Sequence, residues 1–251
     1  MLRSLVISIA LLVSSASAVA DEKYILPIVL TQPVPGAFGS LWTSILTVHN
    51  SSEQKIFAEL YVPCNFECLM EIPAGATVEG VPTLTPFHER VGPGDFLRLN
   101  SEAGERVRLS LRVQDLSRQN LTYGTEIPVV PLSQAFRGPL QLLGVPTADR
   151  FRQMLRVYDF DTRKGARVEV SIYGPDGVRL ASRELELKTA SIAAPGYAEI
   201  GWLAAEFPQV NAFDKVRVQV RPLTADLRFW AFISVTHNET QHLTVLSPAV
   251  H

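Results

Sequence analysis

Residues 107–113, Val-Arg-Leu-Ser-Leu-Arg-Val, carry an aliphatic side chain at every second position and a polar one between. Residues 216–221 (VRVQVR) and 168–172 (VEVSI) show the same alternation. Successive side chains of a β-strand point to opposite faces, so a period of two predicts antiparallel strands with one buried and one solvated face. Turn-forming residues separate these stretches, and long helical periods are absent. The sequence therefore predicts an all-β protein made of antiparallel sandwiches.

The composition is that of a packed globular protein. Hydrophobic residues make up 47% of the 251 residues and charged residues 19%, which excludes a disordered chain, a collagen and a coiled coil. The formal net charge is −2, whereas dedicated nucleic-acid binders usually carry a clear basic excess. We therefore expect no nucleic-acid partner.

The first twenty residues have the pattern of an export signal. Arg3 precedes an apolar run over residues 5–13, and Ala18-Val19-Ala20 has the small-residue form of a cleavage site. The run is shorter than the roughly 20 residues needed to cross a bilayer. We predict a signal peptide over residues 1–20, a secreted or periplasmic mature chain, and no membrane span in that chain.

The only two cysteines, Cys64 and Cys68, have three residues between them. In an oxidising compartment such a close pair is most simply a disulfide that closes a hairpin. Free thiols, a redox pair and a metal site remain as alternatives. The residues favour one structural disulfide between Cys64 and Cys68.

The chain repeats itself. Residues 45–50 (ILTVHN) match residues 154–159 (MLRVYD), and residues 105–112 match residues 214–221, both at an offset of 109. Matches in the same order predict two equivalent β-domains, over residues 21–133 and 134–251. The connection over residues 131–139 is short and marked by proline, so we expect the two domains to contact one another.

The repeat has recognisable marks. A first strand with a proline, residues 25–29, precedes a strand that opens with Trp42 and two polar residues and ends in Asn50-Ser51. This pattern resembles uncharacterised exported bacterial proteins with tandem immunoglobulin-like or fibronectin-like sandwich repeats. The resemblance covers the whole mature chain. It implies two immunoglobulin-like domains and supplies no catalytic residues.

Arginines mark the polar side of two alternating stretches. The predicted outer-face residues are Arg108, Arg112, Arg217 and Arg221. One interpretation is a surface that binds an acidic glycan or another polyanion. The other is a cross-strand charge ladder with the glutamates at positions 169, 184 and 186, which the acidic overall balance favours.

Aromatic residues give a second set of candidates. Trp42, Trp202 and Trp230 could stack on sugars, although tryptophans on strands more often pack inside. Trp230 and Phe232 lie on the face of their strand opposite Phe229, Ala231 and Ile233, so both faces of that strand are apolar. We predict that another part of the chain, or a partner, covers Trp230 and Phe232.

Catalytic motifs are absent from the sequence. It contains no nucleophile elbow, P-loop or dinucleotide-binding fingerprint. The histidines at 237 and 242 fit a hairpin loop, and Asp159 and Asp161 fit a solvated turn better than a calcium site. We expect no enzyme and no cofactor.

The leading function is a secreted non-catalytic protein with a structural, adhesion or protein-interaction role. The alternatives are a carbohydrate-binding module and, less favoured, a periplasmic assembly chaperone that donates the strand at residues 107–113.

Overall fold

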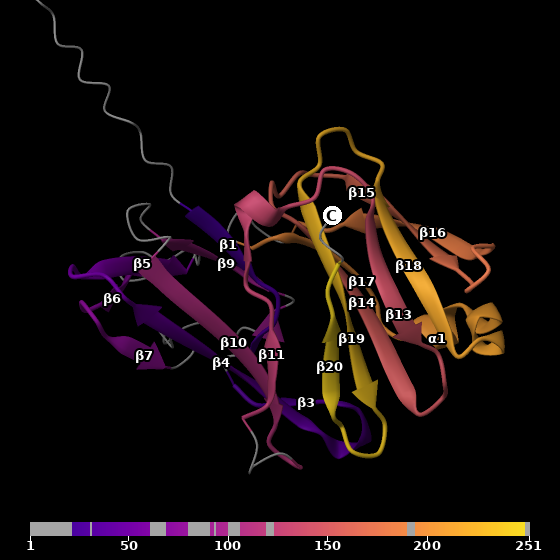
Figure 1. The fold of residues 1–251 in the computed structure, drawn as a ribbon, viewed down its shortest axis with the longest axis horizontal. Coiled ribbons are helices and arrows are strands. Elements are labelled where there is room, and N and C mark those ends of the chain that lie inside the picture. The colour runs from indigo at the N-terminus through magenta and orange to yellow at the C-terminus, as the bar shows by residue number, and fades with distance from the viewer. Residues whose placement is uncertain are drawn as a thin grey trace, which may run out of the picture.

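The structure is a computed structural model that describes residues 22–30, 32–60, 69–79, 91–92, 94–99, 106–118, 123–189 and 194–248. The expected signal peptide, Cys64 and Cys68 lie outside the described residues, so cleavage and the disulfide stay predictions. Across these ranges the chain is mostly β-strand in antiparallel sheets, as the alternation predicts (Figure 1). Among the described helices, none is both long and apolar enough to cross a membrane.

The first sandwich is built from strands between residues 22 and 131. One sheet has the order β12 (Val130–Pro131), β1 (Glu22–Leu26), β9 (Asp95–Leu99), β5 (Ile56–Leu60) and β6 (Leu69–Ile72). The other has the order β11 (Thr125–Ile127), β10 (Val107–Asp115), β4 (Leu41–Asn50) and β3 (Val34–Pro35), and β7 (Thr77–Glu79) also pairs with β4. A small separate sheet joins β2 (Val29–Leu30) to β8 (Val91–Gly92).

The second sandwich follows between residues 140 and 246. Its outer sheet has the order β13 (Leu140–Pro146), β18 (Lys215–Pro222), β15 (Ala166–Tyr173) and β16 (Arg179–Leu187). Its inner sheet, which faces the first sandwich, has the order β17 (Gly196–Ile200), β14 (Phe151–Asp159), β19 (Phe229–His237) and β20 (Leu243–Leu246). One short helix, α1 (Leu203–Glu206), follows β17.

The two sandwiches share one strand order. Leaving aside the two-residue strands, β1-β9-β5-β6 corresponds to β13-β18-β15-β16, and β7-β4-β10-β11 corresponds to β17-β14-β19-β20. In a constant-type immunoglobulin domain the first strand lies in the sheet of the second, and the last lies beside the sixth. Here the first strand, β13, pairs with the sixth, β18, and the seventh, β19, pairs with the second, β14. The first and seventh strands have therefore exchanged sheets relative to that topology.

The sequence repeat agrees with this correspondence in one place and departs from it in another. The match between residues 45–50 and 154–159 joins β4 to β14, which are equivalent. The match between residues 105–112 and 214–221 relates β10 to β18, and this prediction of equivalence is wrong. In the structure β10 is equivalent to β19, and β18 is equivalent to β9. Alternating strands of similar polarity align well wherever they lie, because the pattern records one wet face and not the strand's place in a sheet.

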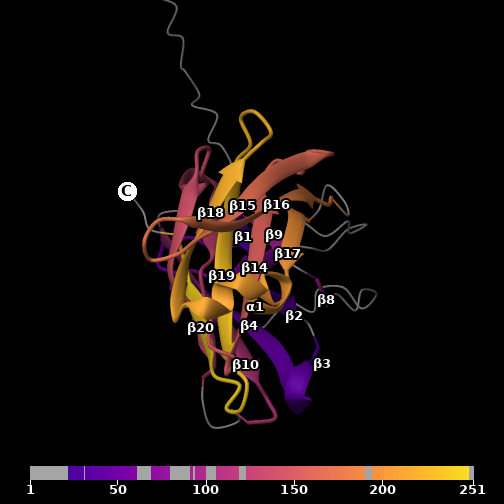
Figure 2. The ribbon, with the colours of Figure 1, turned by 90° about the vertical axis from the view of Figure 1, so that its right-hand side faces the viewer.

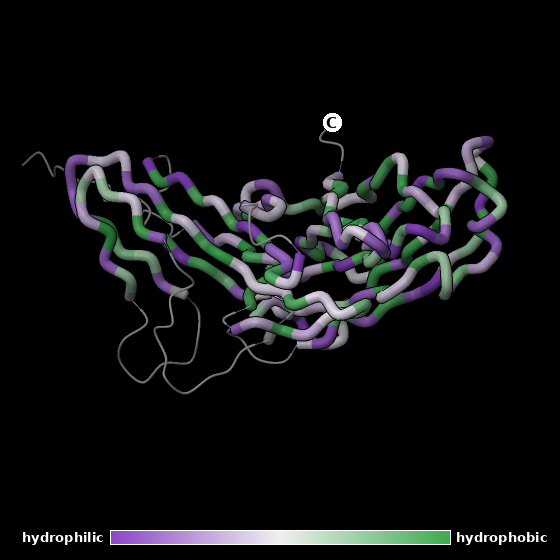
Figure 3. The backbone as a smooth tube through the Cα atoms, turned by 90° about the horizontal axis from the view of Figure 1, so that it is seen from below, coloured by the Kyte–Doolittle hydropathy of each residue, from purple (hydrophilic) through white to green (hydrophobic). Residues whose placement is uncertain are grey.

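Each sandwich has its own hydrophobic core, but the two cores differ in origin. The core of the second sandwich draws on both of its own sheets, with Leu142 and Val218 facing Leu155 and Ile233. The core of the first sandwich continues into side chains of the inner sheet of the second. Along both sandwiches hydrophobic and hydrophilic residues alternate (Figure 3). The first sandwich is therefore packed directly onto its neighbour.

The strand that carries Trp230 and Phe232 forms the contact between the two sandwiches. Its two apolar faces predicted that both would be covered. The exposed fractions of Trp230 and Phe232 are 4% and 0%. Both rings stack with Tyr158, and the centroids of Trp230 and Phe232 lie 5.2 Å apart. Figure 2 shows β19 and β14 running side by side through the middle of the molecule. These rings are buried packing residues, as the prediction of a cover required, and neither is available as an exposed ligand surface.

Further contacts join the two parts near the connection. The predicted boundary at residues 133/134 falls in a short 3-10 turn, Leu132–Gln134. Phe136, just after this boundary, exchanges two backbone hydrogen bonds with Phe229 of its own sandwich, at 2.8 and 3.0 Å. Thr125 of β11 donates its hydroxyl to the carbonyl of Leu243 of β20 at 2.8 Å. The contact between the domains predicted from the short connection is thus present.

Candidate functional site

A cleft of about 620 Å³ lies where the two sandwiches meet. The first sandwich contributes an apolar wall from Pro27, Ile28 and Leu30, from β3 and the turn after it, and from Trp42 and Val113. The second sandwich contributes a floor from its inner sheet and the Gly201-Trp202 bend. A concave site of this size with a few polar groups is the usual form of a ligand pocket.

The floor is the continuation of the face that packs on the first sandwich. Along β14 the side chains that point away from the second core are Arg152, Met154, Arg156 and Tyr158. Tyr158 lies under the first sandwich, whereas Met154 and the two arginines line the cleft. The same face of β19 changes in the same direction: Trp230 and Phe232 are buried under the first sandwich, and Ser234 and Thr236 line the cleft. One sheet face therefore changes from a buried apolar contact to a polar floor.

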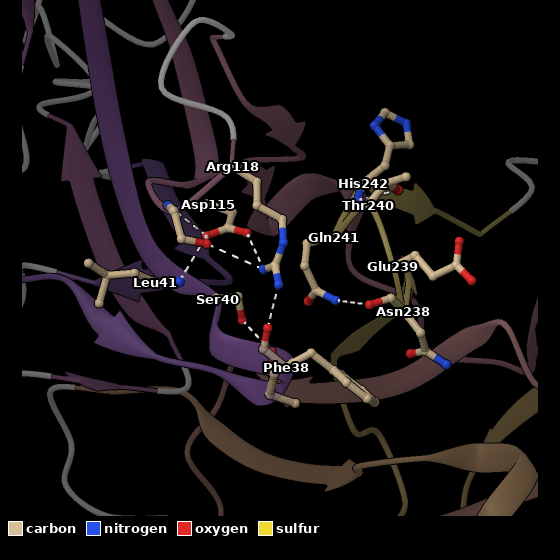
Figure 4. A network of polar contacts seen from close by, with 12 residues as sticks. Phe38, Ser40, Leu41, Asp115, Arg118, Asn238, Glu239, Thr240, Gln241 and His242 are labelled. Atoms are coloured by element: carbon tan, nitrogen blue, oxygen red, sulfur yellow. Dashed lines mark hydrogen bonds and ion pairs between the residues drawn. The ribbon is translucent and has the colours of Figure 1, made fainter.

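A polar network fixes the turn that forms one wall (Figure 4). Asp115 is fully buried and accepts hydrogen bonds from the backbone of Leu41 at 2.8 Å and from Ser117. Burial alone raises the pKa of Asp115, but these hydrogen bonds outweigh it and lower the pKa. Arg118 bridges this carboxylate to the carbonyl of Phe38 at 2.5 Å. The wall turn that contains Phe38 is therefore fixed by Asp115 and Arg118, at the end of β10.

Two tryptophans line the cleft from opposite sandwiches. Trp42 is half-buried on β4, and the exposed fraction of Trp202, beside α1, is 38%. The indole of Trp42 lies against Gly36, where an added Cβ would stand 2.5 Å from the indole nitrogen. Gly36 thus makes room for the ring. Of the three tryptophans considered from sequence, Trp42 and Trp202 remain available to a ligand.

Arg156, Glu199 and Tyr197 form a polar group on the floor. The Arg156 Nε atom lies 3.8 Å from a carboxylate oxygen of Glu199, which also accepts the hydroxyl of Tyr197. The guanidinium lies 5.8 Å from the ring centroid of Phe232. Burial, followed by the hydrogen bond to Glu199, raises the pKa of Tyr197, while Arg156 opposes the rise. Tyr197 is therefore a neutral donor at physiological pH.

Arg152 stands at the other end of the floor. Its Nη2 atom donates to the side chain of Gln241 at 2.9 Å, and its guanidinium lies 4.9 Å from the ring centroid of Phe38. Its Nη1 atom is buried and has no hydrogen-bond partner in the described part of the chain. Burial lowers the pKa of this guanidinium. Arg152 thus brings a partly desolvated positive charge to the cleft.

The four arginines singled out from sequence do not gather at one site. Arg221 pairs with Glu169, directly opposite on β15, at 2.8 Å, as the cross-strand interpretation predicts. Arg217 donates to Gln141. On the first sandwich Arg112 donates to the carbonyl of Tyr123, and Arg108 is exposed opposite His49. Since β10 and β18 are not equivalent strands, the expected common stripe does not form.

The turn after β14 uses its carboxylates internally. Asp159 is fully buried and accepts the backbone N–H groups of Asp161 and Arg163. Asp161 is engaged by Arg228 and Arg163. Asn50, the equivalent of Asp159 on β4, likewise binds backbone groups of its own turn. The described residues contain no cluster of three side chains that could hold a metal ion.

Sequence reasoning missed the two floor arginines. The signal was present, because residues 152, 154, 156 and 158 place two arginines, a methionine and a tyrosine on the face opposite the core positions. A strand with a fully solvated face rarely mixes such residues. In the strand that the chaperone interpretation would donate, β10 pairs with β4 along its whole length and with β11 over Leu111–Val113.

Comparison with known protein families, with curated proteins and with solved structures gives no match for this chain.

Proposed function

We propose that this protein is an exported, non-catalytic binding protein that holds its partner in the cleft between the two sandwiches. One observation carries the proposal: the cleft walls come from two bodies that a continuous hydrophobic core holds together. A groove built in this way exists before the partner arrives, so binding spends little free energy on ordering it.

The polar side chains of the cleft support binding rather than catalysis. Arg156, Glu199 and Tyr197 are fixed by one another, and Arg152 is fixed by Gln241. No histidine, cysteine or aspartate is among the described residues that line the cleft. The proposal includes secretion of the protein. It also includes a likeness to exported bacterial proteins with tandem immunoglobulin-like domains, and this likeness concerns the architecture of two paired sandwiches.

A plugging variant tests the site. Gly201 lines the cleft, and an added Cβ there meets nothing within 4 Å, so Gly201→Trp adds a bulky ring at the groove with free space around its Cβ. Gly138→Trp is the matched control, because Gly138 has the same free space and does not line the cleft. The mature protein and both variants are used to capture partners from the native envelope and medium.

The expected result is a partner retained by the unaltered protein and by Gly138→Trp, and lost by Gly201→Trp. Thermal melting of each variant shows that the fold is kept. Equal capture by all three proteins contradicts the proposal, because the partner then binds outside the cleft.

A further inference from the structure

The cleft offers an aromatic surface from each sandwich. Trp202 exposes 38% of its area, and Trp42 faces the cleft from β4, held in position by the close approach of Gly36. Indole rings present flat, apolar and weakly polarised faces. Such faces suit a ligand with flat C–H surfaces and polar edges, which is the form of a pyranose ring.

The floor supplies both hydrogen-bond donors and acceptors. Arg156 is a donor, Glu199 is an acceptor, Tyr197 gives its proton to Glu199 and offers its oxygen as an acceptor, and the hydroxyls of Ser234 and Thr236 are both. Their mutual contacts hold them in place before a ligand enters. Sugar hydroxyls also donate and accept at once, so a set of mixed groups matches them better than a row of one kind.

The sheet geometry disfavours an extended peptide on this floor. Peptides that bind by strand addition pair with an exposed sheet edge. The floor is instead the face of a sheet, and its central strands are paired on both sides: β14 with β17 and β19, and β19 with β14 and β20. A ligand on this face meets side chains, as a glycan requires.

The charge of the lining residues selects among glycans. Two arginines, Arg152 and Arg156, face the cleft against one carboxylate, that of Glu199. Glu199 already contacts Arg156, whereas Arg152 lines the cleft and forms no ion pair among the described residues. A guanidinium pairs well with a carboxylate, through charge-assisted hydrogen bonds. On the basis of the function proposed above, we propose that the cleft binds an acidic glycan, with Trp42 and Trp202 against its rings and Arg152 on its carboxylate.

The test uses the mature two-domain protein on an array of uronate- and sialate-containing oligosaccharides beside their neutral counterparts. Calorimetric titration of the strongest acidic glycan and its neutral counterpart follows. We expect at least a tenfold preference for the acidic glycan. Trp202→Ala should weaken its binding at least tenfold, and Gly201→Trp should abolish it, while Gly138→Trp leaves it unchanged.

Arg152 variants separate charge from shape. Arg152→Gln should remove the preference for the acidic glycan, and Arg152→Lys should keep part of it, with melting curves confirming that both variants fold. Equal binding of neutral glycans with no effect of Arg152→Gln overturns the acidic assignment. No glycan binding, with a captured partner still lost in Gly201→Trp, overturns this inference and leaves the proposed function standing. Glycan binding that survives Gly201→Trp overturns the site.

Discussion

The hydroxyl of Tyr158, on β14 of the second sandwich, donates a hydrogen bond to the carbonyl of Pro27, in the first, at 2.5 Å. Both residues are buried, and burial raises the pKa of Tyr158 well above its usual value. The bond lies beside the cleft, since Pro27 is one of its wall residues. It fixes the sheet that forms the floor to the segment that forms the wall.

Removing the Tyr158 hydroxyl should weaken the contact between the sandwiches but leave no cavity there. Tyr158→Phe keeps the ring stacking with Trp230 and Phe232 and leaves the buried Pro27 carbonyl without its donor. We expect a loss of about 1–3 kcal/mol in the free energy of unfolding, the cost of an unsatisfied buried polar group. Urea denaturation measures it. A midpoint equal to that of the unaltered protein would show that water reaches the Pro27 carbonyl.

Trp230 and Trp202 should respond in opposite ways to truncation. Trp230 is almost fully buried between the sandwiches, so Trp230→Ala should destabilise the protein by about 3–5 kcal/mol. Trp202→Ala should change stability by less than about 1 kcal/mol, since that ring is exposed, and should act on binding instead. Paired denaturation curves check both values. Similar losses for the two variants would contradict the division between packing and binding.

Gly94 marks a close approach between the two sandwiches. Its φ is +154°, and an added Cβ would stand 2.9 Å from the carbonyl oxygen of Leu26 and 3.0 Å from the ring of Tyr158. Gly94→Ala should therefore cost about 1–3 kcal/mol in stability, because neither the backbone nor the stacked ring can yield freely. Gly138→Ala is the control, with free space around its Cβ. Equal melting temperatures for the two variants would exclude this constraint.

Lys23 makes the contact dependent on pH. Its ammonium donates to the carbonyl of Phe160 at 2.7 Å and lies 3.4 Å from the ring centroid of Phe96. Burial, followed by repulsion from Arg98, lowers its pKa from 10.5 to about 8. Between pH 8 and 10.5 the unfolded chain therefore holds more protons than the folded one, so this group makes stability rise with pH.

Lys23→Met isolates this effect. From pH 7 to pH 9.5, the melting temperature of the unaltered protein should rise relative to that of Lys23→Met. Differential scanning fluorimetry across buffers of equal ionic strength measures the difference. Parallel profiles for the two proteins would show that Lys23 titrates alike in the folded and unfolded states.

The cysteine pair gives a prediction that depends on export. In the native exported protein Cys64 and Cys68 should form one intramolecular disulfide, and its loss should cost about 2 kcal/mol at most, because the loop it closes is short. Intact mass with and without alkylation decides it. Two alkylated thiols in the unreduced protein would rule the bond out.

The sequence by itself determined the strands and the need to cover one of them. Alternation of side chains is a local property, so residues 107–113 and 216–221 predict β10 and β18 without information from the rest of the chain. Trp230 and Phe232, on the second apolar face of β19, likewise required a cover that their burial confirms. The sequence did not determine which strands are equivalent, because the same alternation suits any half-buried strand.

Only the tertiary structure decided the cleft. Arg152 and Arg156 lie on the same strand face as Tyr158, yet that face is buried at one end and open at the other, depending on where the first sandwich ends above it. Trp42 and Trp202 are 160 positions apart in the chain and meet at this cleft only because the sandwiches pack through Tyr158, Trp230 and Phe232. A pattern along one strand records its two faces. What covers each part of a face is set by long-range packing, which no local period contains.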